Sequence, residues 1–191
     1  DDTLMPTILA TCGADLLIYG MGELPLKEIA NRCKRGESIF DMHDVPQTSY
    51  LIEGNKIPEY DGETFELFPH LECCKDKMKQ AKNFRVIEEE SNKMEARRLI
   101  QRVDKNHVTV VNPPFPVMES KDLDASFDLP YTRLPHPKYK GKRIPAYDMI
   151  KFSINIHRGC FGGCSFCAIS AHQGKHITSR SKESIMREVK E

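Results

Sequence analysis

The sequence lacks the features of several large protein classes. None of its apolar runs approaches the roughly 18 residues that a membrane-spanning helix needs. The first ten residues, DDTLMPTILA, contain no basic segment followed by an apolar one, as a secretory signal would. Lys and Arg number 28 and Asp and Glu also number 28, so no overall electric field attracts nucleic acid or an anionic membrane. We therefore expect no membrane and no nucleic acid among its partners.

Common catalytic motifs are also missing. The sequence has no G-x-S-x-G nucleophile motif, no H-E-x-x-H zinc motif and no complete phosphate-binding loop. Gly20 and Gly22 form only half of a G-x-G-x-x-G motif, because Pro25 stands where the third glycine is required. Dinucleotide binding is therefore not indicated.

Cysteine is present in an odd number: Cys12, Cys33, Cys73, Cys74, Cys160, Cys164 and Cys167. A secreted disulfide framework is usually shorter, denser in cysteine and even in count, so we expect a reducing, cytoplasmic compartment. There, the three cysteines clustered within residues 160–167 indicate metal or redox chemistry. The four scattered cysteines are expected to be ordinary buried or surface thiols.

The first third of the chain has the pattern of an α/β domain. Residues 15–20 (DLLIYG) predict a buried strand, and a helix with Pro25 in its first turn and a stop at Gly36 follows. This helix places its apolar residues on one face, namely Leu26, Ile29, Ala30 and Cys33. Residues 5–12 resemble the tail of an earlier helix. Because one βα unit cannot cover both faces of a parallel sheet, we expect this region to be truncated upstream.

A β-rich insertion follows. Short strands are predicted within residues 46–52 and 63–68, and strands over 98–103 and 107–111 flank Asp104-Lys105-Asn106 as a hairpin. The charged stretch that begins at residue 71 predicts a solvated amphipathic helix, with its apolar positions at Met78, Ala81, Phe84 and Ile87.

Residues 112–147 predict an extended linker. Prolines recur at positions 113, 114, 116, 130, 135, 137 and 145, and they exclude long helices. The aromatic and apolar residues of this linker are expected to anchor it on a surface: Phe115, Phe127, Leu129, Tyr131 and Tyr139. Its basic KYKGKR segment is interpreted as a solvated loop, with a phosphate or nucleic-acid contact as the alternative. The sequence thus predicts three parts: an N-terminal α/β region with a β-rich insertion (residues 1–111), a proline-rich linker (112–147) and a last segment (148–191).

The last segment predicts a strand, a loop and a helix. Phe152, Ile154 and Ile156 alternate as in a half-buried strand over residues 151–159. Ser181 is a good N-cap for a helix whose apolar stripe is Ile185, Met186 and Val189. This helix still continues at residue 191, so we expect truncation downstream as well.

Between that strand and that helix lies a C-x-x-x-C-x-x-C motif made of Cys160, Cys164 and Cys167. Thiolates are soft ligands that favour iron–sulfur clusters, zinc or copper(I). Gly159, Gly162 and Gly163 give the backbone freedom to wind around a metal. A structural zinc site or an electron-transfer cluster normally has four protein ligands, whereas the local set is three. One iron with an open coordination site is what a catalytic cluster needs.

An aromatic residue, Phe166, precedes the third cysteine. In this motif and its flanks, DLPYTRLPHP and FSINIHRGCFGGCSFCAISAHQGKHITSRSKESI, the chain resembles the YgiQ-type radical S-adenosylmethionine (radical SAM) proteins. GADLLIYGMGELPLKEIA, PQTSYLI and VVNPP extend the resemblance over nearly the whole chain. It implies an α/β fold: a fragment of a cobalamin-binding-like N-terminal α/β region, followed by the first βα unit of a partial (βα)6 radical SAM barrel. No cobalamin-type D-x-H-x-x-G occurs, so cobalamin binding is not supported.

The resemblance further implies that Cys160, Cys164 and Cys167 hold a [4Fe–4S] cluster whose fourth iron binds S-adenosyl-L-methionine. One-electron reduction, by an external donor such as flavodoxin or ferredoxin, would release a 5′-deoxyadenosyl radical that acts on an unknown substrate. Phe166 would carry a backbone contact to adenine. Arg158 and Arg180 are candidates for pairing with the S-adenosyl-L-methionine carboxylate.

Some interpretations stay open. A zinc or electron-transfer site would need a fourth ligand, for which His157, His172 and the Cys73-Cys74 pair are the candidates. His172, Gln173 and His176 either line the active site or are exposed polar residues. The Gly-Gly-Glu-like segment that follows the second strand in such enzymes is absent after Cys167, so we expect this chain alone to be inactive.

Overall fold

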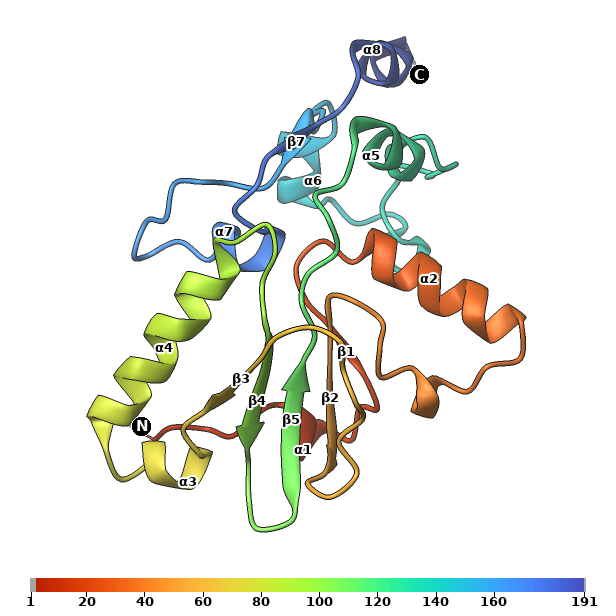
Figure 1. The fold of residues 1–191 in the computed structure, drawn as a ribbon. Helices are drawn as coiled ribbons and strands as arrows, with labels where there is room; N and C mark the ends of the chain where they lie inside the picture. The colour runs from red at the N-terminus through yellow and green to blue at the C-terminus, as the bar shows by residue number, and fades with distance from the viewer. Residues whose placement is uncertain (1–2, 191) are drawn as a thin grey trace.

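A computed structural model describes residues 3–190 of the chain. Its regular elements, in chain order, are α1 (Leu9–Cys12), β1 (Leu17–Ile18), α2 (Glu23–Lys34), the 3-10 turn η1 (Ile39–Asp41), β2 (Thr48–Glu53), β3 (Thr64–Leu67), α3 (His70–Cys73), α4 (Lys77–Ser91), β4 (Arg98–Arg102), β5 (His107–Val111), α5 (Ser120–Phe127), the 3-10 turn η2 (Pro137–Tyr139), α6 (Pro145–Ile150), β6 (His157–Arg158), α7 (Ile169–Gln173), β7 (Thr178–Ser179) and α8 (Lys182–Lys190). Figure 1 shows a sheet with α4 on one side and α2 on the other, and the segment after β5 gathered above them.

The five-stranded sheet has the order β1-β2-β5-β4-β3. The β3 and β4 strands run parallel and are joined through α4, while the other neighbouring pairs are antiparallel. The predicted α/β class is therefore confirmed. The expectation that residues 15–36 form a βα unit of a parallel sheet is wrong, because β1 pairs antiparallel with the next strand, β2. The only parallel pair in the described part is the one that a helical crossover connects, as parallel pairing requires.

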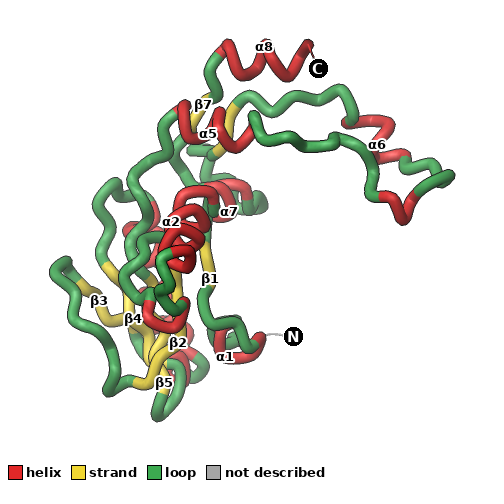
Figure 2. Tube along the Cα trace, turned by 90° about the vertical axis from the view of Figure 1, so that its right-hand side faces the viewer, coloured by secondary structure: helices red, strands yellow, loops and turns green. Residues whose placement is uncertain are grey.

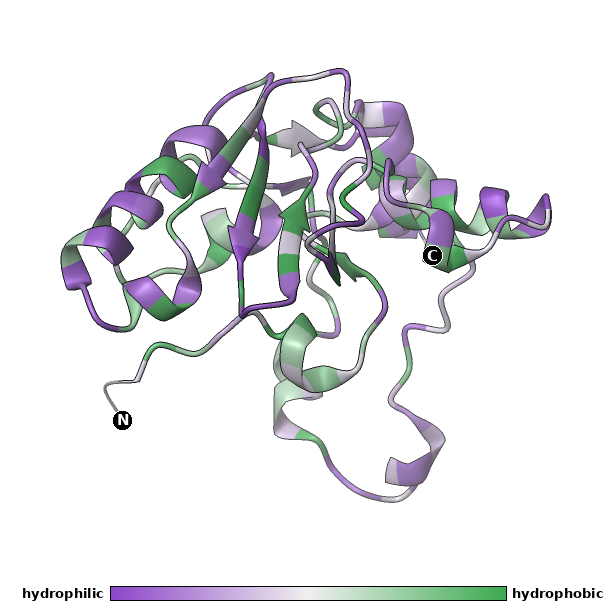
Figure 3. Cartoon of the chain, turned by 60° about the horizontal axis from the view of Figure 1, so that its bottom comes forward, coloured by the Kyte–Doolittle hydropathy of each residue, from purple (hydrophilic) through white to green (hydrophobic). Residues whose placement is uncertain are grey.

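The buried core lies where α2 and the segment before β2 meet the sheet. Ile29, Met42 and Val45 form a cluster, against which Ile18 and Phe115 pack. The central strands contribute further buried residues, namely Tyr50, Leu99, Val108 and Val110. Figure 3 shows the hydrophobic colouring concentrated in the strands, whereas the long helix at the left of that view is mostly hydrophilic.

The predicted hairpin is confirmed, with β4 and β5 in antiparallel register from Leu99–Val111 to Arg102–Val108. Its turn is held by the Asp104 carboxylate, which accepts hydrogen bonds from the backbone N–H groups of Asn106 and His107 at 2.7 and 2.8 Å. These bonds hold the pKa of Asp104 at about 2. The predicted strands within residues 46–52 and 63–68 appear as β2 and β3.

The buried faces of both long helices differ from the predicted ones. In α4 the expected apolar positions are exposed, with Phe84 at 60% exposure, and the inward face carries Asn83, Val86 and Glu90. The Asn83 side chain donates to the backbone O of Phe68 and accepts from its N–H, both at 2.9 Å. In α2, likewise, Ile29 is buried but the other three predicted positions are exposed. Specific polar partners outside the helix decided the inward face of α4.

The linker predicted for residues 112–147 contains no long helix in the structure, but it is not extended throughout. Between its prolines lies a proline-free stretch that forms α5, with Leu123 fully buried. Of the predicted anchors, Phe115 packs on the core and Phe127 is half-buried, whereas the other three, Leu129, Tyr131 and Tyr139, are exposed. Figure 2 shows the chain around α6 extending away from the body of the molecule.

The predicted strand over residues 151–159 is mostly absent. Only His157 and Arg158 are extended and paired, as β6, and Phe152 is 88% exposed. Residues 152–156 have no strand beside them within the described part of the chain, and an isolated strand cannot satisfy its backbone groups. The predicted cap of the last helix is confirmed, since Ser181 Oγ accepts from the N–H of Ser184 at 3.1 Å.

Within residues 3–190, no helix is both long enough and apolar enough to cross a membrane.

Candidate metal-binding loop

The three clustered cysteines lie on a loop that is closed at its base. The two strands that border it, β6 and β7, pair antiparallel, with Arg158 opposite Thr178. Inside that pair, the N–H of Cys160 donates to the carbonyl of Gly174 at 3.1 Å. Residues 160–174 therefore form a closed loop whose two ends are hydrogen-bonded to each other.

Gly159 makes this closure sterically possible. Its φ is +89°, a conformation that residues with a side chain rarely adopt. A Cβ at this position would stand 2.0 Å from the carbonyl oxygen of His176, on the returning strand. Only glycine fits where the chain enters the loop.

Two of the three thiols lie on the same side of the loop. The sulfurs of Cys160 and Cys164 are 3.3 and 3.7 Å from the position that a Cβ would occupy on Gly162. The N–H of Gly162 donates to the Cys160 sulfur at 3.4 Å. Cys167 follows one turn later, its N–H bonded to the carbonyl of Cys164 at 3.0 Å. The glycine thus leaves space that a larger residue would fill next to two sulfurs.

These residues fit an iron–sulfur cluster in donor chemistry and in backbone shape. Backbone N–H groups that donate hydrogen bonds to sulfur tune the reduction potential of such clusters. The side chains are not drawn together into a metal cage, since no group of three His, Cys, Asp or Glu side chains in residues 3–190 is placed to hold a metal ion. All seven cysteines are free thiols. The ligand set of Cys160, Cys164 and Cys167 stays a prediction.

One candidate for a fourth ligand is placed far from this loop. Cys73 and Cys74 lie at the N-terminal end of α4, where Cys74 contacts His70 at 3.4 Å and Cys73 accepts from Asn83 at 3.1 Å. The cysteine loop packs against the other end of α4, through Lys175. A helix of 15 residues is about 22 Å long, so the Cys73-Cys74 pair does not reach the loop.

The two predicted arginines lie in different surroundings. Arg180 has a fully buried side chain and donates to Ser184, to the carbonyl of Asn155 and to Glu188. Arg158 is partly exposed and donates to Glu23 at 2.5 Å. Both guanidinium groups lie over the Phe127 ring, at 4.3 Å for Arg180 and 5.3 Å for Arg158. Arg180 is thus committed to the protein interior, whereas Arg158 lies beside the loop entrance.

The other predicted site residues are spread over the loop. Phe166 is 91% exposed, and His172 is exposed at the end of α7. Gln173 accepts a long hydrogen bond from the N–H of Gly159 at 3.4 Å. The Nε2 atom of His176 is buried and has no hydrogen-bond partner. Gln173, through its hydrogen bond with Gly159, and His176, through the close approach of its backbone carbonyl to Gly159, lie at the base of the loop.

Three residues that the sequence did not single out contact this loop, namely Glu23, Glu88 and Lys175. Lys175 donates to Glu88 at 2.7 Å and to the hydroxyl of Ser91 at 2.9 Å. Nothing local in the sequence marks these residues, because Glu23 is 135 positions from its partner Arg158, and Lys175 is 87 and 84 positions from Glu88 and Ser91.

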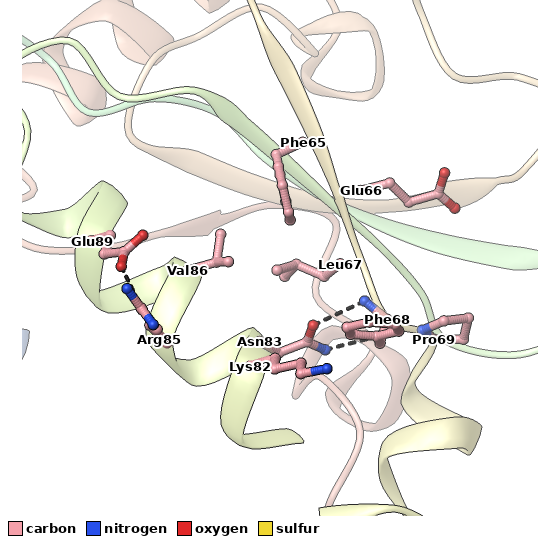
Figure 4. Close-up of a pocket in the computed structure, with 10 residues that line it drawn as sticks. All are labelled: Phe65, Glu66, Leu67, Phe68, Pro69, Lys82, Asn83, Arg85, Val86 and Glu89. Atoms are coloured by element: carbon pink, nitrogen blue, oxygen red, sulfur yellow. Dashed lines mark hydrogen bonds and ion pairs between the residues drawn. The ribbon is translucent and has the colours of Figure 1, made fainter. Parts of the chain in front are cut away.

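An apolar groove lies elsewhere, away from the cysteine loop. Figure 4 shows a groove of about 520 Å³ between β3 and α4, lined by apolar residues such as Phe65, Leu67 and Val86 and bordered by the Arg85–Glu89 ion pair. None of the predicted site residues lines it.

Comparison with known proteins gives a consistent result. A model of the family described as "Radical SAM N-terminal" matches residues 1–153. A UPF0313 protein of Bacteroides thetaiotaomicron is 58% identical over 202 residues, which include 100% of this chain and 32% of that protein. A UPF0313 protein of Methanocella arvoryzae is 43% identical, over 100% of this chain and 31% of its own length. The UPF0313 protein YgiQ of Escherichia coli is 35% identical, over 98% of this chain and 32% of its own length. The chain thus spans about a third of these curated relatives. No solved structure matches it.

Proposed function

Because the chain belongs to the YgiQ-type (UPF0313) radical SAM family, we propose that it carries the cluster-binding loop of a radical S-adenosyl-L-methionine enzyme. Cys160, Cys164 and Cys167 would hold a [4Fe–4S] cluster. When bound, this cluster supplies one electron that breaks the sulfur–C5′ bond of S-adenosyl-L-methionine, giving methionine and a 5′-deoxyadenosyl radical.

The observation that carries this proposal is the closed loop itself. It carries three cysteines within eight residues, and Gly162 leaves room beside the Cys160 and Cys164 sulfurs. Three thiolates satisfy three irons and leave one iron for an exchangeable ligand, as the proposed chemistry needs.

The surrounding residues have binding and shielding roles in this proposal. Arg158 offers a cation two positions before Cys160, where it would pair with the carboxylate of S-adenosyl-L-methionine. Phe166 is exposed and would contribute a backbone contact to adenine. Arg180 is the weaker candidate for pairing with this carboxylate, because its N–H groups already donate to Ser184, Asn155 and Glu188.

The partners follow from the electron balance. One electron must enter for each S-adenosyl-L-methionine cleaved, and we propose an external one-electron donor such as flavodoxin or ferredoxin. Seven free thiols suit a reducing compartment, and we propose the cytoplasm. The substrate that loses hydrogen to the radical is not indicated by these residues.

The test uses the full-length protein that contains this chain. After anaerobic reconstitution, iron and sulfide content, the electron paramagnetic resonance (EPR) spectrum of the reduced cluster and release of 5′-deoxyadenosine are measured with and without S-adenosyl-L-methionine. Cys164→Ala should abolish the cluster, whereas Cys33→Ala, an exposed cysteine on α2, should retain it.

The rival functions are a zinc-binding module and an electron-transfer protein. Uptake of zinc without iron would favour the first. A cluster whose EPR spectrum does not respond to S-adenosyl-L-methionine would favour the second. Either result would refute the proposed function.

A further inference from the structure

Two ion pairs hold the cysteine loop from opposite sides. Arg158, just ahead of the loop, is bonded to Glu23 at the start of α2 at 2.5 Å. Lys175, just after the loop, is bonded to Glu88 near the end of α4 at 2.7 Å. In both pairs the base belongs to the loop segment and the acid to a helix that flanks the sheet (Figure 1).

We propose that Glu23 and Glu88 are positioning residues of the radical SAM site. Through Arg158 and Lys175 they fix the two ends of the cysteine loop on the N-terminal region. This inference rests on the proposed function for its consequence, but the clamp itself is a property of the chain without any cofactor.

The local chemistry supports each contact. Glu23 is the first residue of α2, where the positive end of the helix dipole stabilises a carboxylate. Its second oxygen, Oε2, is buried and has no hydrogen-bond partner, so Arg158 is the charged group on which this carboxylate depends. Arg158 is also held over the Phe127 ring of α5 at 5.3 Å. The guanidinium is therefore fixed by an acid and by an aromatic face.

Lys175 meets the opposite end of a helix. Its ammonium group is bonded to Glu88 and to Ser91, the last residue of α4, where the dipole is negative and favours a cation. Its side chain is 16% exposed, so the pair is partly shielded from solvent. Partly buried pairs with hydrogen bonds are stronger than fully exposed ones.

The two clamps act on the part of the loop that matters for metal retention. Between Arg158 and Lys175, the loop is closed by the Cys160–Gly174 backbone bond and by the close approach of Gly159 to His176. Release of either clamp would let these contacts open and would let the thiols separate. The N-terminal region then determines how long a bound cluster survives and how firmly Arg158 is oriented.

The experiment compares Glu23→Gln, Glu88→Gln and the double variant in the full-length protein. The matched controls are Glu28→Gln on α2 and Glu89→Gln on α4, whose carboxylates pair with Arg32 and Arg85 instead. The first measurement is hydrogen–deuterium exchange over residues 157–178 of the cluster-free protein. We expect about fivefold faster exchange in each single variant, since such a pair contributes on the order of 1 kcal/mol, and no change in the controls.

The second measurement is the rate at which the reconstituted protein loses iron to a chelator, with the EPR change on adding S-adenosyl-L-methionine. We expect about fivefold faster loss in each single variant. The EPR change should weaken in Glu23→Gln and be restored in part by Glu23→Asp, which keeps the charge. High salt should bring the wild type toward the double variant, because salt screens both pairs.

The outcomes separate this inference from the proposed function. Unchanged exchange over residues 157–178 in the double variant would overturn the clamp, whatever the protein binds. Faster exchange with equal iron loss in variant and wild type would overturn the positioning role. If the wild type takes up no iron, the proposed function fails, and the exchange result alone decides whether the clamp exists.

Discussion

Replacing Glu90 by glutamine should loosen the junction between α4 and β4. The Glu90 side chain is only 3% exposed. It accepts hydrogen bonds from the backbone N–H and the Nε of Arg97 at 2.8 and 2.9 Å, and from Lys93 at 2.8 Å. Burial by itself would raise the pKa of Glu90, but these donors outweigh burial and hold it at about 2.

The size of the effect follows from that pKa. Each pKa unit corresponds to about 1.4 kcal/mol, so lowering the pKa from 4.5 to about 2 stabilises the folded junction by up to about 3 kcal/mol. Arg97 and Lys93 are partly exposed, which screens the pairing. We therefore expect Glu90→Gln to lose about 2 kcal/mol, or roughly 30-fold in local opening.

The same effect should depend on pH. A carboxylate with a lowered pKa in the folded state contributes stability above its unfolded pKa of 4.5, and this stability is lost as the pH falls toward about 2. The difference between wild type and Glu90→Gln should shrink by about half or more between pH 7 and pH 3.

The assay is hydrogen–deuterium exchange over residues 77–105 of the full-length protein, corrected for the intrinsic exchange rate at each pH. Glu89→Gln is the matched control, because Glu89 pairs with the exposed Arg85. Equal exchange in the two variants at pH 7 would refute the reasoning, as would a difference that stays constant down to pH 3.

Three further changes test other contacts. Gly159→Ala should reduce soluble yield and prevent iron uptake, because its Cβ would lie 2.0 Å from the His176 carbonyl; normal iron content would contradict this. Asn112→Ala should lower the free energy of unfolding by about 3 kcal/mol, because it leaves the buried Arg98 without its side-chain acceptor. The midpoint of thermal unfolding should fall accordingly, and an unchanged midpoint would contradict this. Ser181→Ala should destabilise α8 by about 1 kcal/mol, measured by exchange over residues 182–190, with Ser181→Asp retaining the cap.

Local patterns were predicted well. The β4–β5 hairpin depends on alternating side chains and on the hydrogen bonds of Asp104 within its own turn. The cap at Ser181 depends on a residue three positions away. Both structures are set by contacts between neighbours in sequence, which the order of residue types expresses directly.

Two kinds of prediction failed: those that placed the apolar face of a helix inward, and the one that expected a strand where no second strand lies beside it. The periodicity of α4 indicates Phe84 as an inward residue, but Asn83 and Glu90 take that face because Phe68 and Arg97 supply their partners. The alternation at residues 152–156 is that of a strand, yet a strand also needs a second strand beside it. A hydrophobic pattern does not specify which distant residue will be adjacent.

The sequence by itself determined which donor atoms the cysteine loop carries and how they are spaced. Three thiols at fixed spacing, with glycine at positions 159, 162 and 163, define a short segment that can wind around a metal, and spacing is a local property. Only the tertiary structure decided what holds that segment. Glu23 and Glu88 come to its two ends across 135 and 87 positions, because folding of the sheet brings α2 and α4 beside it. Such pairings depend on the path of the whole chain, and no local pattern encodes that path.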